Sequence, residues 1–151
     1  LDKHWDLPVA HHPCTYLSSS GMHWTSRGLR DPRLIEDAYE FALKFFHAPI
    51  YRIAIENPIG ILSTRVRKPD QFGDDASKST CLWLKNLPLL SPTKYVEPRV
   101  VLHGGKLRKR WANQTDSGQN RLGPSEDRWK MRSKTYHGIA EAMADQWGGL
   151  L

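Results

Sequence analysis

A cysteine and a carboxylate each follow a short apolar run, and together they could add a nucleophile to an electron-poor ring. Cys14 follows the apolar stretch from Trp5 to Ala10 in the segment AHHPCTYL, and Glu56 directly follows the run YRIAI. If both runs are strands of an open α/β sheet, both side chains face the crevice where such sheets bind ligands. A thiolate there is a nucleophile, and the carboxyl group can donate or accept the proton.

Each of these side chains also has an ordinary structural interpretation. A thiolate at Cys14 is favoured if the neighbouring His11 and His12 supply positive charge, whereas a lone cysteine is commonly a buried apolar residue. Glu56 could cap a loop or form a salt bridge, because a buried carboxylate is costly without a partner. A carboxyl group with a raised pKa could instead bind or protonate a ring nitrogen. The residues themselves leave both interpretations open.

Two further kinds of site use the same residue types. Zinc is held by cysteine and histidine, but the spacing His-His-x-Cys fits no common zinc pattern and the chain has no Cys-x-x-Cys. We therefore predict no metal site from the available donors, which are His4, His11, His12, Cys14, His23 and Cys81. A cysteine hydrolase that uses Cys14 with His12 or His23 stays open as an alternative.

A strand, a helix and a second strand would bring Cys14 and Glu56 to one edge of a sheet. The apolar runs at 7–10 and 52–55 are predicted strands. Between them, apolar residues at three- and four-residue spacing predict an amphipathic helix from Pro32 to His47, with Asp31 as its N-cap. This order predicts a βαβ unit with parallel strands.

The rest of the chain predicts a less regular arrangement. We expect strands at 80–84 and 99–102, a long loop or mobile arm at 103–132, and a helix from Ser133 to Trp147 that Gly148-Gly149 ends. The apolar face of that helix is predicted to contain Ile139, Ala140, Met143, Ala144 and Trp147. The chain therefore divides into a catalytic α/β core at 1–102, a basic arm at 103–132, and a C-terminal helix at 133–151 that packs on the core.

The composition favours a polyanionic partner and excludes a membrane-spanning protein. The 151 residues carry a net charge of +6, and the sequence pI is about 9.5. No apolar run approaches the roughly 18 residues that span a bilayer. Because no signal peptide is visible, we expect a cytoplasmic protein with reduced thiols. The segment KLRKRW at 106–111 mixes cations with an aromatic residue, which suits phosphate contacts.

Several motifs together resemble one protein family. The segment DLPVAHHPC, which ends at Cys14, resembles the strand and Pro-Cys loop of DNA cytosine-5 methyltransferases, and IAIENP at 53–58 looks like their Glu-Asn-Val loop. The two motifs stand at a spacing close to that of the family. The segments TCLWLKNLP at 80–88 and RSKTY at 132–136 are similar to phage and prophage proteins described as cytosine methyltransferase-like.

The resemblance implies a fold, a reaction and the residues that perform it. The fold would be a partial Rossmann-like methyltransferase domain with a mainly parallel sheet. Cys14 would add to C6 of a cytosine flipped out of DNA, and Glu56 would bind N3 and the exocyclic amine. Asn57 would orient its loop, and Thr15 would stabilise the thiolate. S-adenosyl-L-methionine would supply the methyl group, and DNA phosphates would be held by Lys78, Lys106, Arg108, Lys109 and Arg110.

The chain also departs from the family pattern. The Phe-x-Gly-x-Gly loop that binds much of the cofactor is absent, so no cofactor-binding residue is assigned, and Pro58 replaces the usual valine. A non-catalytic nucleic-acid-binding protein derived from a methyltransferase fold is therefore the main alternative. A sheet without its first strands would expose an edge, which makes a homodimer an expectation as well. The cytoplasm of a bacterial or phage-infected cell is the expected location.

Overall fold

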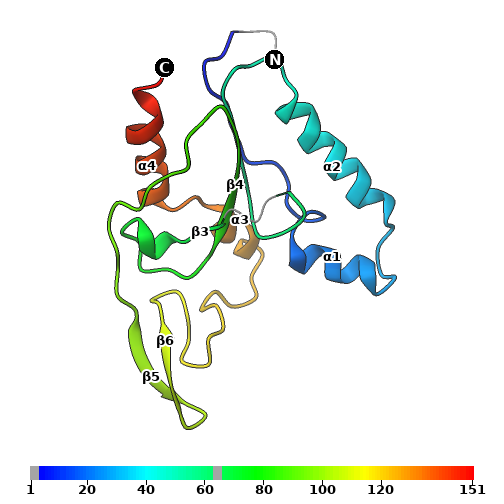
Figure 1. Ribbon diagram of the computed structural model, residues 1–151. Coiled ribbons are helices and arrows are strands. Elements are labelled where there is room, and N and C mark those ends of the chain that lie inside the picture. The colour runs from blue at the N-terminus through cyan, green and yellow to red at the C-terminus, as the bar shows by residue number, and fades with distance from the viewer. Residues whose placement is uncertain (1–3, 63–65) are drawn as a thin grey trace. The chain divides into compact units, whose positions relative to one another are not determined.

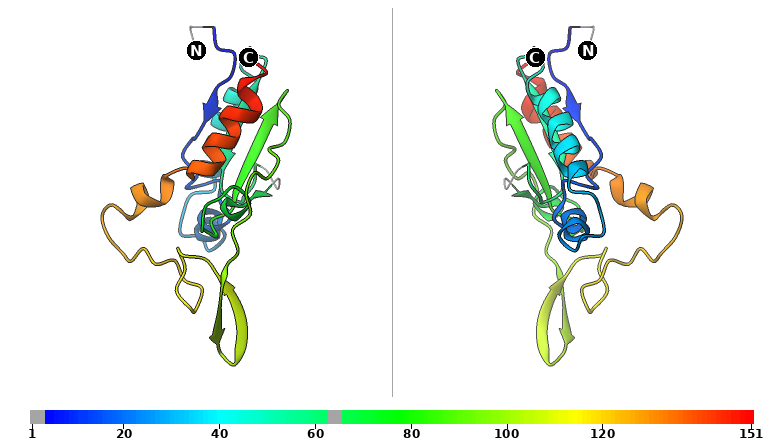
Figure 2. Two further views of the ribbon diagram at one scale, coloured as in Figure 1. Left: turned by 90° about the vertical axis from the view of Figure 1, so that its left-hand side faces the viewer. Right: turned by 90° about the vertical axis from the view of Figure 1, so that its right-hand side faces the viewer.

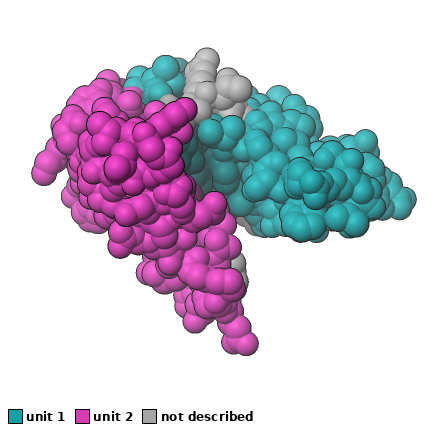
Figure 3. Space-filling view, turned by 90° about the horizontal axis from the view of Figure 1, so that it is seen from below, with its two compact units in different colours: residues 1–67, 79–89, 151 teal, residues 68–78, 90–150 magenta. Residues whose placement is uncertain are grey.

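The chain folds into two compact units. The computed structural model describes residues 4–62 and 66–151 (Figure 1). Unit 1 takes residues 1–67, 79–89 and 151, and unit 2 takes residues 68–78 and 90–150 (Figure 3). Both candidate motifs, around Cys14 and around Glu56, therefore belong to unit 1.

Unit 1 contains a four-stranded mixed sheet, counted over the described residues. Its strands are β1 (Val9–Ala10), β2 (Ile53–Asn57), β3 (Val66–Arg67) and β4 (Thr80–Lys85), in the order β1-β2-β4-β3. β1 pairs with β2 in parallel, with Val9 opposite Ala54. Helices α1 (Ser19–Ser26) and α2 (Arg33–Phe46) lie between these two strands in the sequence. The predicted strand–helix–strand order with parallel strands is confirmed for this pair.

The prediction of a mainly parallel, Rossmann-like sheet is wrong. β4 runs antiparallel to both of its neighbours, β2 and β3. A parallel return would need a crossover of a dozen or more residues, usually a helix that covers the sheet. The described part of the link between β2 and β4 contains only the two-residue strand β3 and the short 3-10 helix η1 (Pro69–Gln71). Such a link returns the chain beside β2 in the opposite direction.

The amphipathic pattern of α2 explains how β2 is buried. Asp31 accepts a hydrogen bond from the backbone N–H of Arg33 at 3.0 Å, but the N-cap of α2 is Pro32, one residue after the predicted Asp31. Phe45 and Phe46 pack against a buried cluster of Ala48, Ile50, Ile53 and Ile55. The ring of Phe46 stacks on Trp83 of β4 with 4.3 Å between the ring centroids. Burial of a side chain such as Ile53 or Ile55 contributes about 1.5–3 kcal/mol, which holds β2 at the centre of unit 1.

Unit 2 contains a β-hairpin that projects as a two-stranded ribbon (Figure 2). Its strands are β5 (Arg99–His103) and β6 (Lys106–Arg110), which pair antiparallel. Gly104 and Gly105 join them with φ values of 59° and 71°. Such a two-residue turn favours glycine because both positions need positive φ. Part of the segment 103–132 that we predicted as a loop is therefore the second strand of a hairpin.

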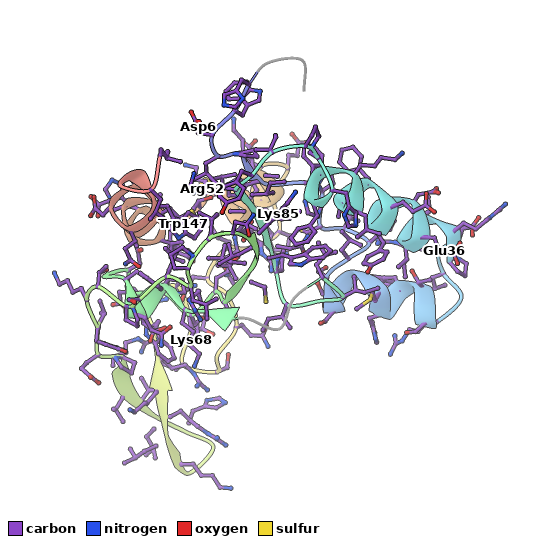
Figure 4. All side chains as sticks on the ribbon, turned by 45° about the horizontal axis from the view of Figure 1, so that its top comes forward. Asp6, Glu36, Arg52, Lys68, Lys85 and Trp147 are labelled. Atoms are coloured by element: carbon purple, nitrogen blue, oxygen red, sulfur yellow. The ribbon has the colours of Figure 1, made fainter. Side chains whose placement is uncertain are left out.

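The C-terminal region forms two helices where one was predicted. They are α3 (Arg128–Ser133) and α4 (His137–Gly148). Lys134 and Tyr136 have extended backbone, with ψ near 132° and 138°, which ends one helix before the next begins. Ile139, Met143 and Trp147 are buried as predicted, but Ala142 is buried in place of Ala140 and Ala144. Figure 4 labels Trp147 beside α4. Each described helix is too short or too polar to cross a membrane.

Candidate functional site

Two loops of unit 1 are joined by backbone hydrogen bonds, and we call residues 11–19 and 56–61 the paired loops. The N–H of Ser19 donates to the carbonyl oxygen of Ile59 at 2.9 Å, and the N–H of Ile61 donates to that of Leu17 at 3.0 Å. Gly60 permits this approach, because a Cβ atom there would lie 1.9 Å from the Leu17 oxygen. The structure therefore places the loop that contains Cys14 beside the loop that follows β2.

The Glu56 carboxylate is held by side chains from two other segments. The Oγ1 hydroxyl of Thr80, at the start of β4, donates to Oε1 of Glu56. Nδ1 of His11 lies 3.2 Å from Oε2. The Glu56 side chain is only 16 % exposed, so these partners offset the cost of burying its charge. The carboxylate is thus fixed at the end of β2, next to the segment that leads to Cys14.

His12 and Asn57 form a second contact between the paired loops. Nδ2 of Asn57 lies 3.2 Å from Nε2 of His12, and both residues are buried. Burial lowers the pKa of His12 below its usual range. The charge of Glu56 raises this pKa to a lesser extent, and His11 lowers it slightly further. A neutral imidazole is a hydrogen-bond acceptor at Nε2, which matches the amide donor of Asn57. In the described part of the chain, His12 Nδ1 and Asn57 Oδ1 are buried polar atoms without a hydrogen-bond partner.

The lowered pKa of His12 predicts a loss of stability on acidification. In the folded state this imidazole resists protonation below its ordinary value of 6.5, so the unfolded chain binds more protons in that range. The free energy of unfolding should therefore be fully retained above pH 6.5 and should fall as the pH drops below it. Urea denaturation at about pH 7.5 and about pH 5 measures this difference. His12→Gln, which keeps an acceptor for Asn57, should reduce it, and an unchanged difference would contradict the assignment.

Cys14 and Thr15 lie in the same loop but do not make the contacts that join the two loops. The carbonyl oxygen of Cys14 accepts hydrogen bonds from the N–H groups of Leu17 and Ser18, at 3.1 and 3.0 Å. Its side chain is partly exposed, and Thr15 is exposed. From this loop, the side chains of His11 and His12 reach across to Glu56 and Asn57. The sequence pointed to these histidines as sources of charge, as metal ligands and, for His12, as the partner of Cys14 in a cysteine hydrolase.

A second thiol lies close to Glu56 but is buried. Cys81 is fully buried on β4, opposite Asn57 of β2. Burial raises the pKa of its thiol, and the negative charge of Glu56 raises it further. A thiol that is inaccessible and difficult to ionise is a poor nucleophile. Cys14 is therefore the better candidate of the two.

This difference between the thiols predicts selective alkylation. With iodoacetamide near neutral pH, Cys14 should react at least about tenfold faster than Cys81, because reagent reaches only the partly exposed thiol without unfolding. Peptide mass spectrometry over a time course gives both rates in one sample, and the urea-unfolded chain serves as the reference for equal access. Equal rates in the folded protein would show that the Cys14 thiol is no more accessible than the Cys81 thiol.

The residues predicted to bind nucleic acid all lie in unit 2. Lys106, Arg108 and Lys109 are exposed on β6, and Arg110 at the end of that strand is partly buried. Lys78 lies elsewhere in the unit, where its Nζ donates to the carbonyl oxygen of Arg132 at 2.9 Å. These five cations therefore occupy two places within the unit, a hairpin strand and the neighbourhood of Arg132.

Thr80 is the site residue that the sequence analysis missed. Its position beside Glu56 follows from the antiparallel pairing of β4 with β2, which the expectation of a parallel sheet had excluded. Over the residues that the structure describes, no three His, Cys, Asp or Glu side chains are clustered closely enough to hold a metal ion. Comparison with models of protein families, with curated proteins and with solved structures finds no significant match to this chain.

Proposed function

We propose that this chain carries the nucleophile and the base-binding carboxyl group of a DNA cytosine-5 methyltransferase-like protein, with Cys14 and Glu56 in those roles. The observation that supports the proposal is the pairing of the two loops, since a nucleophile and an acid must reach the same ring. The contact of His11 with Glu56 and the hydrogen bond that the Asn57 amide donates to His12 join the segment before Cys14 to the end of β2. The segments PC and EN, which suggested the family, thus belong to neighbouring loops.

The proposed chemistry begins with addition to the cytosine ring. Once the thiol proton has passed to water, the Cys14 thiolate forms a bond to C6, and the C5–C6 π bond opens. The electron pair is delocalised over the ring, and Glu56, after its carboxylate takes up a proton from water, donates that proton to N3. The product is an enamine in which C5 is nucleophilic. Thr80 and His11 would hold the carboxyl group in the orientation that this proton transfer needs.

The methyl donor S-adenosyl-L-methionine does not fit the cavity that the structure shows in unit 2. That cavity lies in unit 2, and the residues that line it include two lysines and two arginines but no aspartate or glutamate. A sulfonium cation is repelled by such a lining, and the hydroxyl groups of a ribose are commonly bound by an acidic residue. We therefore derive no methyl-transfer step, and the proposal concerns the addition of Cys14 to the base.

Hydrogen exchange at C5 tests this addition without any methyl donor. When a cytosine-containing DNA oligonucleotide is incubated with the protein in heavy water, reversible addition should exchange the C5 hydrogen for deuterium, because C5 of the enamine takes up a deuteron. Mass spectrometry of the nucleosides measures the exchange, and an oligonucleotide with 5-methylcytosine is the control without a C5 hydrogen. An absence of exchange above the rate without protein would refute the proposed chemistry.

The role of Glu56 gives a separate prediction. Glu56→Gln keeps the shape and hydrogen-bonding capacity of the side chain but removes its acid proton. The exchange rate should fall about 100-fold, in the range that general acid catalysis contributes. The exposed residue Glu40 on α2 provides the matched control, and Glu40→Gln should change the rate less than about twofold. Equal rates in the two variants would remove Glu56 from the mechanism.

A non-catalytic nucleic-acid-binding protein is the second candidate function. The observation that favours it is β6, a strand of five residues in which four are lysine or arginine. Such a strand suits sequence-independent phosphate contacts, whose affinity falls steeply with salt. Salt-sensitive DNA binding together with no C5 exchange would support this function instead. Hydrolysis of an activated ester that depends on Cys14 would indicate a cysteine hydrolase.

A further inference from the structure

A cavity in unit 2 gathers positive charge from three separate parts of the chain. It has a volume of about 530 Å³, within the range of roughly 300–1,000 Å³ that is typical of ligand pockets. Its charged lining consists of Lys78, Arg121, Arg132 and Lys134. We call this cavity, with its four cations, the basic cavity. It lies wholly within unit 2, so its geometry does not depend on the placement of the two units.

The cations of the basic cavity are not neutralised by neighbouring carboxylates. Within residues 4–62 and 66–151, none of the four takes part in an ion pair. Their hydrogen bonds go to neutral groups instead: Lys78 donates to the carbonyl oxygen of Arg132 and Arg121 to that of Gln114, at 2.9 Å in both cases. Four like charges around one hollow repel each other, so an anion there relieves an unfavourable arrangement.

Two acidic residues that interact electrostatically with residues of the cavity lining already have other partners. Asp116, whose carboxylate is influenced by the charge of Arg121, accepts a hydrogen bond from the guanidinium of Arg99 at 2.5 Å. Asp74 accepts a hydrogen bond from the N–H of Gly138 at the start of α4, at 3.0 Å. These carboxylates therefore stabilise the surrounding structure and leave the charge of the cavity positive.

Hydrogen bonds between lining residues preorganise part of the cavity wall. Oδ1 of Asn113 accepts from the N–H and the hydroxyl of Ser77, at 3.1 and 3.3 Å. Nδ2 of Asn113 lies 3.5 Å from the Tyr136 hydroxyl, and the ammonium of Lys78 lies 6.0 Å from the centre of the Tyr136 ring. Burial raises the pKa of Tyr136, so its hydroxyl stays protonated and adds no negative charge. The wall is therefore neutral where it is not cationic.

We propose that the basic cavity binds the phosphate group of a nucleotide, either free or within a DNA strand. Two guanidinium groups can each form paired hydrogen bonds to phosphate oxygens, and two lysines add point charges. The cavity is larger than one phosphate ion needs, which leaves room for the attached sugar. This inference rests on the lining of unit 2 and does not depend on the chemistry proposed for Cys14.

Titration calorimetry on the full chain tests the inference with three probes. They are inorganic phosphate, deoxycytidine monophosphate and a short single-stranded DNA oligonucleotide. Arg132→Gln and Lys134→Gln remove charge from the lining, and the backbone carbonyl of residue 132 that Lys78 uses is unaffected. Lys130→Gln is the matched control, because Lys130 is an exposed cation on the same helix as Arg132 and does not line the cavity.

The expected result is a difference between the lining variants and the control. Each lining variant should weaken binding about tenfold, as expected for the loss of a charged hydrogen-bonding group, and Lys130→Gln less than about twofold. Binding of the mononucleotide would assign a nucleotide site, and binding of the oligonucleotide alone would assign a DNA backbone site. Equal weakening by all three variants would show non-specific attraction to a basic surface and would overturn the inference. No binding of any probe would overturn it as well.

Discussion

Replacing Cys14 by serine is expected to reduce hydrogen exchange at cytosine C5 on the order of 10³-fold. The reason is the nucleophile itself, because a serine hydroxyl is not ionised near neutral pH and this loop provides no established base for it. The substitution is nearly isosteric, and the backbone carbonyl of residue 14 would still accept from Leu17 and Ser18. The loss should therefore appear in the exchange rate while the free energy of unfolding stays nearly constant.

The second cysteine provides the control for this experiment. Cys81 is close enough to Glu56 for the carboxylate to raise its pKa, but it is fully buried. Cys81→Ala should leave the exchange rate within about twofold once the protein is confirmed to be folded, although the lost burial lowers stability by about 1 kcal/mol. If Cys14→Ser keeps its exchange activity, or if Cys81→Ala alone abolishes it, the nucleophile has been assigned to the wrong residue.

Substituting alanine for Gly60 is expected to cause a large loss of stability in unit 1. The added Cβ would lie 1.9 Å from the carbonyl oxygen of Leu17, and this neighbour is backbone rather than a flexible side chain. The paired loops must then separate, which breaks the hydrogen bonds from Ser19 to Ile59 and from Ile61 to Leu17. We expect a decrease of about 3 kcal/mol in the free energy of unfolding, measured by urea denaturation.

Gly123 offers the matched glycine-to-alanine control. A Cβ atom there would meet nothing within 4 Å, so Gly123→Ala should change stability by less than about 0.5 kcal/mol. Gly60→Ala should also slow C5 exchange, because Glu56 and Cys14 are attached to the two loops that move apart. If Gly60→Ala is as stable as Gly123→Ala, the loops are not packed as closely as the structure places them.

Local sequence patterns were sufficient to predict the elements that lie next to the candidate site. The helical spacing of Phe41, Phe45 and Phe46, after the Asp31-Pro32 pair, predicts α2 nearly to its ends. The short apolar runs before the Pro-Cys and Glu-Asn segments predict β1 and β2 and their parallel pairing. These features depend on residues that are close in sequence, so periodicity and capping are enough to predict them.

The same patterns gave wrong predictions where a short segment was compatible with two different secondary structures or helix boundaries. The basic segment at 106–110 looked like loop because its side chains are polar, yet the adjacent glycines allow a tight hairpin with β5. The helix predicted from Ser133 to Trp147 begins only at His137 in the structure. Extended backbone at Tyr136 separates α3 from α4, and no single residue in that stretch is a strong helix breaker.

The sequence by itself determined that Cys14 follows one of two parallel strands and that Glu56 lies at the end of the other, because short-range periodicity encodes those strands and α2 between them. Only the tertiary structure decided which partners surround them. Thr80 reaches Glu56 across 24 residues of sequence because β4 returns antiparallel to β2. Lys78 meets Arg132 across 54 residues to form part of the basic cavity. Contacts at such separations depend on strand direction and on the packing of distant segments, which the periodicity of a short window does not contain.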